Sequence, residues 1–403
     1  MLRRLLSYAE EKLALGVLLA GLHDRRQRPR IALLVVVRSV VVMFLARLGS
    51  LNGLVQTRPS AFWRRYLLAP LPSDDSLSRI AAAMEPDDVR RVHGELYRQL
   101  QAHKALPPLV AGLRPLILDG HESHSSYRRH CPACCQRVVK TVQGERVQFY
   151  HRYVAALLAT GALPLWLDAE PLRPGEDEIA AALRLLERLL DRYPRAFDLV
   201  LGDALYTDPR VYSFLLGRGK DVLTVLKGDH PGLLANALGL FAQQAPQTLP
   251  DGSLAWDASG FTSWPQVKAT VRVLRTAETR VVRRQATGER EVLRSQWMWV
   301  TTLSPHRAST AAAARLGHAR WQIENQGFNE VVTRWHLDHV YHHQPVALLV
   351  FLLLGLLAVN VFFAFYSRNL KPEVRQHQSC QHVARRLAAE IYVSLDLPPS
   401  RPP

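Results

Sequence analysis

Two aspartates lie where a metal-dependent phosphoryl-transfer site could be built. Asp119 and Asp203 each end a short apolar run, residues 116–118 and 199–202, of the kind that forms a buried β-strand. Carboxylates at strand ends are well placed to hold a divalent cation at the edge of a sheet. A single aspartate after a strand more often caps a turn or a helix, so the pair needs a third group before it indicates chemistry.

Glu324 supplies that third group. Residues 311–335 have the pattern of one long helix, and an apolar stripe with spacings of 3, 4, 3 and 4 runs through Trp321, Glu324, Phe328, Val331 and Trp335. A charge on a buried stripe is costly unless it is paired or metal-bound. We therefore expect Glu324 to face the core beside both aspartates. Three such acids could hold two Mg²⁺ ions that act on a phosphodiester.

A cysteine and histidine cluster follows Asp119. The C-x-x-C pair Cys131 and Cys134, together with His151, is typical of a zinc half-site, because zinc binds thiolate and imidazole in a tetrahedron. The other candidate ligands are Cys135, His124 and His130. The alternative is a loop of reduced, packed cysteines. A bound zinc would hold the loop beside Asp119 and take no part in the chemistry.

A second group of histidines lies late in the chain. His336, His339 and His343 would share one face if a helix continued through them, but Pro345 indicates a turn nearby. For these histidines we favour phosphate contacts or an ordinary surface position over a metal site.

The charge of the chain indicates an anionic partner. Its 403 residues carry 51 Lys or Arg against 35 Asp or Glu, a formal net charge of +16. Nucleic acid and anionic membrane surfaces are the usual partners of such chains. The excess is concentrated: residues 1–70 hold twelve basic and three acidic residues, and residues 260–300 hold eight and three.

Cysteine use and hydropathy bear on the compartment. Three of the four cysteines fall within five residues, which excludes a disulfide framework and favours a reducing cytosol. Residues 346–366 carry no charge and are long enough to span a bilayer, but a buried helix of a large domain looks the same. We expect the buried helix, and no membrane partner.

Four motifs carry a resemblance to a known family. They are LILDG at 116–120, LGDALY at 201–206, VLKG at 225–228 and RWQIEN at 320–325. Together they resemble the DDE transposases of bacterial insertion sequences, which have a ribonuclease H-like catalytic core. The resemblance covers roughly residues 110–365, and a β-rich insertion at the family's usual place would explain the 121 residues (324 − 203) between Asp203 and Glu324.

The resemblance implies an α/β fold, with a ribonuclease H-like mixed sheet flanked by helices. The expected parts are a helical DNA-binding or accessory domain (1–110), the catalytic domain in two pieces (111–248 and 305–370), a basic β-rich insertion (249–304) and a basic tail (371–403). Asp119, Asp203 and Glu324 would bind Mg²⁺ or Mn²⁺, cleave double-stranded DNA at the element ends and join it to target DNA. A homodimer on DNA is implied too.

The match to the family is incomplete. The related subgroup has Tyr, Arg and Lys at positions that here hold Gly317, Arg320 and Val331, so only the arginine agrees. Lys227 and Arg334 are candidate substitutes. The full set of expected DNA contacts is Arg320, Lys227, Arg334, Lys268, Arg272, Arg283 and Arg284.

The expected protein is therefore a DNA transposase acting in the cytoplasm at the nucleoid. Three alternatives stay open at this stage: an inactive or domesticated DNA-binding descendant, a ribonuclease H-like nuclease without strand transfer, and a membrane-associated basic protein.

Overall fold

One large mixed sheet runs through the molecule. The computed structural model describes residues 1–142, 144–284 and 288–393, so the end of the expected basic tail, 394–403, lies outside the described residues. The ten strands are ordered β2-β3-β1-β5-β6-β10-β9-β8-β7, with β4 also paired to β3. Their bounds are β1 Pro115–Ser126, β2 Cys135–Thr141, β3 Gly144–Leu158, β4 Leu165–Pro171, β5 Leu199–Gly202, β6 Asp221–Val225, β7 Gln247–Thr248, β8 Leu254–Phe261, β9 Val271–Arg283 and β10 Arg290–Thr301.

The centre of the sheet is parallel and the flanks are antiparallel. Strands β1, β5 and β6 run parallel, and β10 pairs antiparallel with β6. The short central strands β5 and β6 are buried along nearly their whole length, as expected for strands covered on both faces. The β-structure expected between 250 and 303 is present, and it extends the central sheet from β6 outward.

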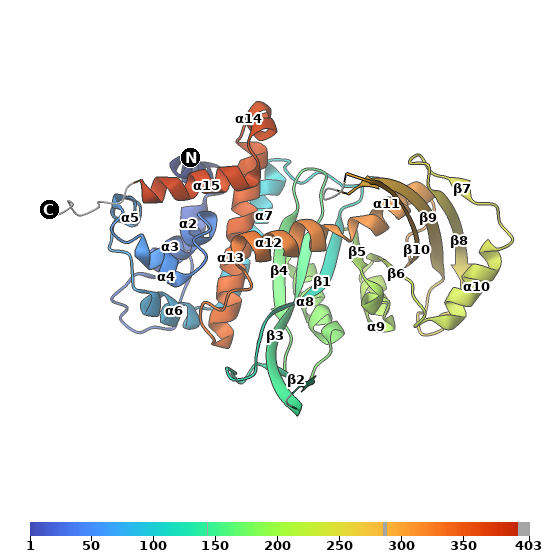
Figure 1. The fold of residues 1–403 in the computed structure, drawn as a ribbon, viewed down its shortest axis with the longest axis horizontal. Coiled ribbons are helices and arrows are strands. Elements are labelled where there is room, and N and C mark those ends of the chain that lie inside the picture. The colour runs from blue at the N-terminus through green and yellow to red at the C-terminus, as the bar shows by residue number, and fades with distance from the viewer. Residues whose placement is uncertain (143, 285–287, 394–403) are drawn as a thin grey trace.

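Helices cover the sheet. The connecting helices are α8 (Glu178–Arg192), α9 (Pro209–Leu216), α10 (Pro231–Phe241) and α11 (Thr310–Ala319). Figure 1 shows the remaining helices grouped at one end of the sheet, around the long α13. They are α1 Leu2–Leu13, α2 Leu15–Ala20, α3 Leu33–Leu45, α4 Leu51–Gln56, α5 Ala61–Leu67, α6 Asp74–Ala82, α7 Pro86–Ala102, α12 Asn329–Trp335, α13 Pro345–Arg368, α14 Pro372–His377 and α15 Cys380–Tyr392. This mixed α/β architecture is consistent with the expected ribonuclease H-like fold.

Helix α13 contains the apolar segment noted in the sequence. By length and composition it could cross a membrane, yet 78% of its most apolar window is buried inside the protein. It packs against α3, α6, α7 and β4. Its apolar side chains therefore have protein neighbours, as the buried-helix interpretation requires.

Two buried polar groups tie the helical end to the sheet. Asn360 of α13 accepts a hydrogen bond from the Trp166 N–H (2.9 Å) and donates one to the Trp166 carbonyl (2.7 Å), which explains a polar residue inside an apolar helix. Arg90 of α7 is buried and donates to Asp168 Oδ1 of β4 (2.9 Å). Both contacts satisfy groups that would be costly to bury alone.

Candidate active site

Asp119 and Asp203 lie at the same edge of the sheet. Ile117 of β1 is paired with Leu201 of β5. Asp119 comes two residues after Ile117, and Asp203 comes two residues after Leu201. Because the strands are parallel, Asp119 within β1 and Asp203 directly after β5 both lie just past the point where the pairing of β1 with β5 ends. The arrangement expected from the two apolar runs is therefore present. One detail differs: Asp119 does not end its strand, since β1 continues to Ser126 by pairing with β3.

The electrostatics of Asp119 show that the three acids influence one another. Burial raises the pKa of Asp119 to about 7, and the negative charges of Asp203 and Glu324 add to the rise. The Arg320 guanidinium and the Gly120 N–H, which donates to Asp119 Oδ1 (2.9 Å), act in the opposite direction. The site thus concentrates negative charge at a partly buried position, where a cation would be stabilised.

Asp203 is held by a short turn. Its Oδ1 accepts a hydrogen bond from the Leu205 N–H (2.9 Å) and so caps the 3-10 helix Ala204–Tyr206. A side chain at Gly202 would place its Cβ 2.6 Å from the Tyr206 Cβ, so the tyrosine packs directly over the glycine. The LGDALY motif therefore contains the end of β5, the capping Asp203, and Tyr206, which packs back over Gly202.

Glu178, at the start of α8, is a fourth acid of this region. The Tyr206 hydroxyl donates to its Oε1 (2.9 Å), Arg152 pairs with its Oε2 (2.6 Å), and burial raises its pKa. A Cβ at Gly120 would lie 2.2 Å from Glu178 Oε2, so the acid packs on the backbone beside Asp119. Sequence reasoning missed Glu178 because an acid in the first turn of a helix is ordinary.

Glu324 differs from its prediction. The expected continuous helix ends with α11 at Ala319, and residues Ile323–Phe328 form a π-helix before α12 begins. The changed pitch takes Glu324 off the buried stripe, and its side chain is 45% exposed. The prediction of a core-facing Glu324 is therefore wrong, because the spacing argument assumed α-helical geometry. A π-helical turn inside a helix is frequent at functional sites.

Arg320 lies inside the site rather than on its surface. The side chain is buried and pairs with Glu324 one helical turn later. Its guanidinium also lies 5.4 Å from the centroid of the Trp321 ring. Arg320 was expected to contact DNA, but its nearest anion is Glu324.

The two unmatched family positions have steric explanations. A Cβ at Gly317 would lie 2.5 Å from the Trp299 indole, so no tyrosine fits there. Val331 is 1% exposed, which leaves no room for a charged lysine to reach solvent. Lys227, one of the proposed substitutes, follows β6 at the same edge of the sheet as Asp203 and is exposed.

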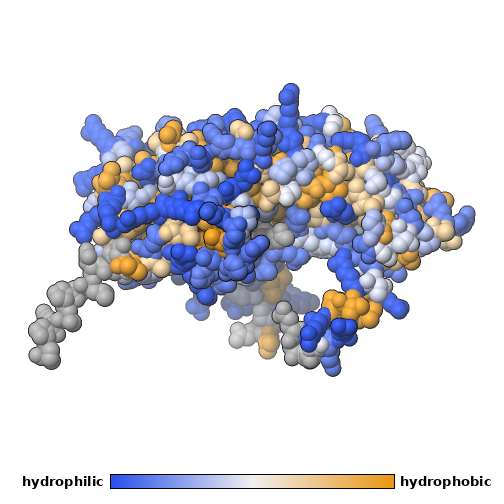
Figure 2. All heavy atoms as spheres, turned by 90° about the horizontal axis from the view of Figure 1, so that it is seen from above, coloured by the Kyte–Doolittle hydropathy of each residue, from blue (hydrophilic) through white to orange (hydrophobic). Residues whose placement is uncertain are grey.

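The other expected DNA contacts divide by exposure. Lys268 and Arg283 are exposed, while Arg284 and Arg334 are exposed but paired with Glu291 (2.7 Å) and Glu330 (3.2 Å). Arg272 is 2% exposed, pairs with Asp257 and donates to the Ala308 carbonyl (2.7 Å). The expectation that Arg272 contacts DNA is therefore wrong, because its guanidinium stabilises the protein interior. Figure 2 shows hydrophilic residues over most of the visible face, with apolar groups in smaller areas between them.

The cysteine and histidine cluster is assembled from distant segments. Within the described residues, Cys131, Cys134, His151 and His343 bring one ligand atom each to within 4.8 Å of one another. Three of these are the ligands expected from sequence, and His343 joins them from the late histidine group. Cys135 points away, with its Sγ 3.9 Å from the Arg173 carbonyl.

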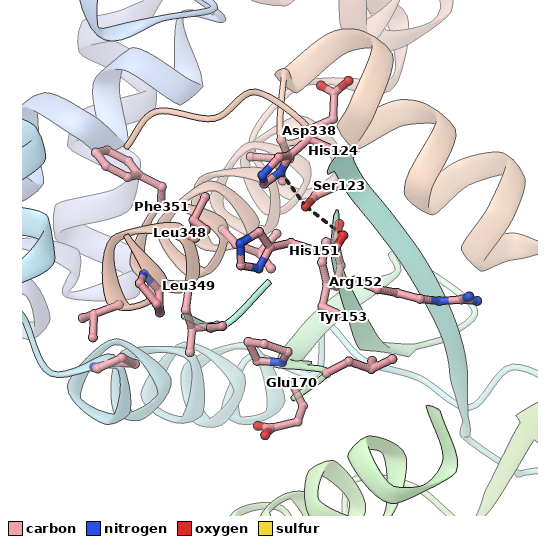
Figure 3. Close-up of a pocket in the computed structure, with 18 of the residues that line it drawn as sticks. Ser123, His124, His151, Arg152, Tyr153, Glu170, Asp338, Leu348, Leu349 and Phe351 are labelled. Atoms are coloured by element: carbon pink, nitrogen blue, oxygen red, sulfur yellow. Dashed lines mark hydrogen bonds between the residues drawn. The ribbon is translucent and has the colours of Figure 1, made fainter. Parts of the chain in front are cut away.

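A cavity of about 340 Å³ lies beside this cluster and away from the three acids. It is lined by His124, His151, Tyr153, Asp338 and apolar residues of α13 (Figure 3). Its lining is mixed, with Arg90, Arg152 and Arg173 beside the apolar residues, and it includes none of the three acids.

One comparison with known proteins identifies the family of the chain. A family model described as a transposase DDE domain matches residues 135–361, more than half of the chain. The chain belongs to this family of DDE transposases. The match includes Asp203 and Glu324, whereas Asp119 precedes it. A search of curated proteins found no match.

Proposed function

We propose that this protein is a DNA transposase of a bacterial insertion sequence, in which Asp119, Asp203 and Glu324 form the catalytic site. The observation that carries the proposal is the placement of Asp119 and Asp203 on paired parallel strands, with Glu324 close enough to raise the pKa of Asp119. The reaction would cleave the element ends and join the freed 3′-hydroxyl to target DNA.

The residues fit a hard divalent cation. All three carry carboxylate oxygens, which Mg²⁺ and Mn²⁺ prefer. Burial raises the pKa of Asp119 and repulsion from Asp203 and Glu324 adds to the rise, an effect that a bound cation would offset. Such a metal would polarise the scissile phosphate and activate the attacking oxygen.

Residues around the acids have positioning roles in this proposal. Arg320 holds Glu324 through a pair whose arginine is buried, so the carboxylate has a restricted orientation. Tyr206 and Arg152 hold Glu178 against Gly120, which keeps the backbone after Asp119 in the strand. Lys227 is exposed at the same edge of the sheet as the acids. It is our candidate for the phosphate contact that the family's lysine would make, since that lysine is replaced by Val331 here.

The proposed partner is duplex DNA, bound mainly through its phosphates. The basic residues of 1–70 and 260–300 supply the charge, and the exposed Lys268, Arg283 and Arg284 are the proposed contacts of the β region. A homodimer on DNA and a cytoplasmic, nucleoid-associated location complete the proposal.

One specific observation favours a second candidate, a DNA-binding descendant that no longer cuts. Gly317 and Val331 replace two family residues and their surroundings exclude the originals. A strand-transfer assay distinguishes the candidates. Purified protein is incubated with Mg²⁺ and DNA that carries both flanks of the gene, where the proposal expects inverted repeats. Nicks at the 3′ ends followed by joined products support the transposase, nicks without joining indicate a nuclease, and tight binding to intact DNA indicates the descendant.

A further inference from the structure

We propose that Cys131, Cys134, His151 and His343 form a structural zinc site. Two of the ligands come from the loop before β2, one from β3, and one from the connection between α12 and α13. The site is separate from the acidic edge, and its test does not depend on transposase activity.

Five of the six distances between the ligand atoms are close to those of a tetrahedral zinc site, and all six are within 4.8 Å. Bonds of about 2.3 Å to sulfur and about 2.05 Å to nitrogen place two sulfurs about 3.8 Å apart, two nitrogens about 3.4 Å apart, and sulfur about 3.6 Å from nitrogen. The Sγ atoms of Cys131 and Cys134 lie 3.8 Å apart, and the Nε2 atoms of His151 and His343 lie 3.3 Å apart. His151 Nε2 lies 3.3 Å from Cys131 Sγ and 3.2 Å from Cys134 Sγ, and His343 Nε2 lies 3.5 Å from Cys134 Sγ.

Hydrogen bonding alone gives a poorer account of this cluster. A thiol is a weak donor and a weak acceptor, and two imidazole nitrogens that face each other need one shared proton. Four soft or borderline ligands converging on one point are instead what zinc selects. Because the protein supplies all four ligands, no position stays open for substrate, which assigns the ion a structural role.

The location of the site suggests what the ion would stabilise. Cys134 and His343 are 209 positions apart and close that stretch of chain into one loop, and His343 lies two residues before α13. A bound zinc would therefore hold the arm formed by β1, β2 and β3 against the connection that follows the Glu324 helix. Closure of so long a loop opposes unfolding through the entropy of the unfolded chain.

The chain offers adjacent matched controls for the test. The binding variants are Cys134→Ser and His343→Asn, and the controls are Cys135→Ser and His342→Asn at the neighbouring positions. Each protein is expressed with added zinc, purified without a histidine tag, and analysed for metal by mass spectrometry. We expect about one zinc per chain in the wild type and both controls, and loss of most of the zinc in both binding variants.

The outcomes are decisive in both directions. If His343→Asn contains as much zinc as the wild type, the four-ligand assignment is overturned. If Cys134→Ser and Cys135→Ser lose equal amounts of zinc, the placement of the site is overturned. Because a binding variant could fail to fold, the full-length wild type is also treated with a chelator and reloaded. A fall in Tm that zinc, but not Mg²⁺, restores supports the site. A folded wild type that neither contains zinc nor takes it up contradicts it.

Discussion

Tyr206 lies so close to Gly202 that a methyl group on the glycine would overlap the tyrosine Cβ and Cγ atoms, at 2.6 and 2.7 Å. Asp203 lies between these two residues and caps the turn that brings the tyrosine back. The position of the aspartate therefore depends on the space left by its neighbouring glycine.

Replacing Gly202 by Ala tests this dependence. The ring and Cβ of Tyr206 would have to move, and overpacking of this kind costs about 1–3 kcal/mol of stability. We expect a lower free energy of unfolding, measured by urea denaturation, and a loss of cleavage activity larger than the loss of stability explains. Gly228→Ala is the control, because no atom lies within 4 Å of its added Cβ. Equal behaviour of the two variants would contradict the packing argument.

The raised pKa of Asp119 predicts how the stability of the metal-free protein depends on pH. The folded state keeps its proton up to about pH 7, whereas the unfolded chain loses it near the ordinary value of 3.8. Stability is therefore lost as the pH rises from 3.8 to about 7. Asp119→Asn avoids this loss, so it should be more stable than the wild type at pH 8, by on the order of 1–3 kcal/mol after allowance for solvent screening.

Thermal unfolding at pH 4 and pH 8, in the presence of a chelator, measures the effect. The advantage of Asp119→Asn should disappear at pH 4, and Mg²⁺ should stabilise the wild type more than the variant at pH 8. The exposed Asp191→Asn serves as the control. A variant that is less stable than the wild type at pH 8 would be inconsistent with a crowded acidic site.

The pair formed by Asn360 and Trp166 predicts a stability effect far from the acids. Asn360→Leu leaves the buried Trp166 N–H without its acceptor, which costs about 1–3 kcal/mol. The free energy of unfolding should fall by this amount while DNA affinity stays unchanged. If α13 instead spanned a membrane, the leucine variant would be at least as stable, and the protein would remain in the membrane fraction after high-salt washing.

Salt dependence tests the proposed phosphate contacts. Lys227→Ala and Arg283→Ala should each weaken binding to all DNA sequences alike. Each should also reduce the slope of a plot of the logarithm of the DNA-binding constant against the logarithm of the salt concentration by about one. Arg195→Ala is the control, because this exposed arginine precedes β5 and so lies at the opposite end of the strand from Asp203. An unchanged slope in Lys227→Ala would remove that residue from the interface.

The sequence could predict the elements that carry the acids, because strand ends and amphipathic helices leave local patterns. It could not predict the orientation of Glu324, since the apolar spacing of 311–335 fits a regular α-helix and gives no sign of the π-helix Ile323–Phe328. It also could not connect His343 to Cys134, because contacts between residues 209 apart leave no periodic signal. The same limit applies to Arg272. Its positive charge led us to expect a DNA contact, but only the folded structure reveals its buried ion pair with Asp257.

Cleavage of an element end by acid variants tests the central claim most directly. Asp119→Asn, Asp203→Asn and Glu324→Gln are compared with Glu122→Gln, an acid near Asp119 that pairs with Arg137 at the surface. In Mg²⁺, each of the three variants should cleave at least about a hundredfold more slowly, while DNA binding and folding are kept and Glu122→Gln stays active. A folded Glu324→Gln or Asp119→Asn protein that cleaves at the wild-type rate would contradict the three-acid site.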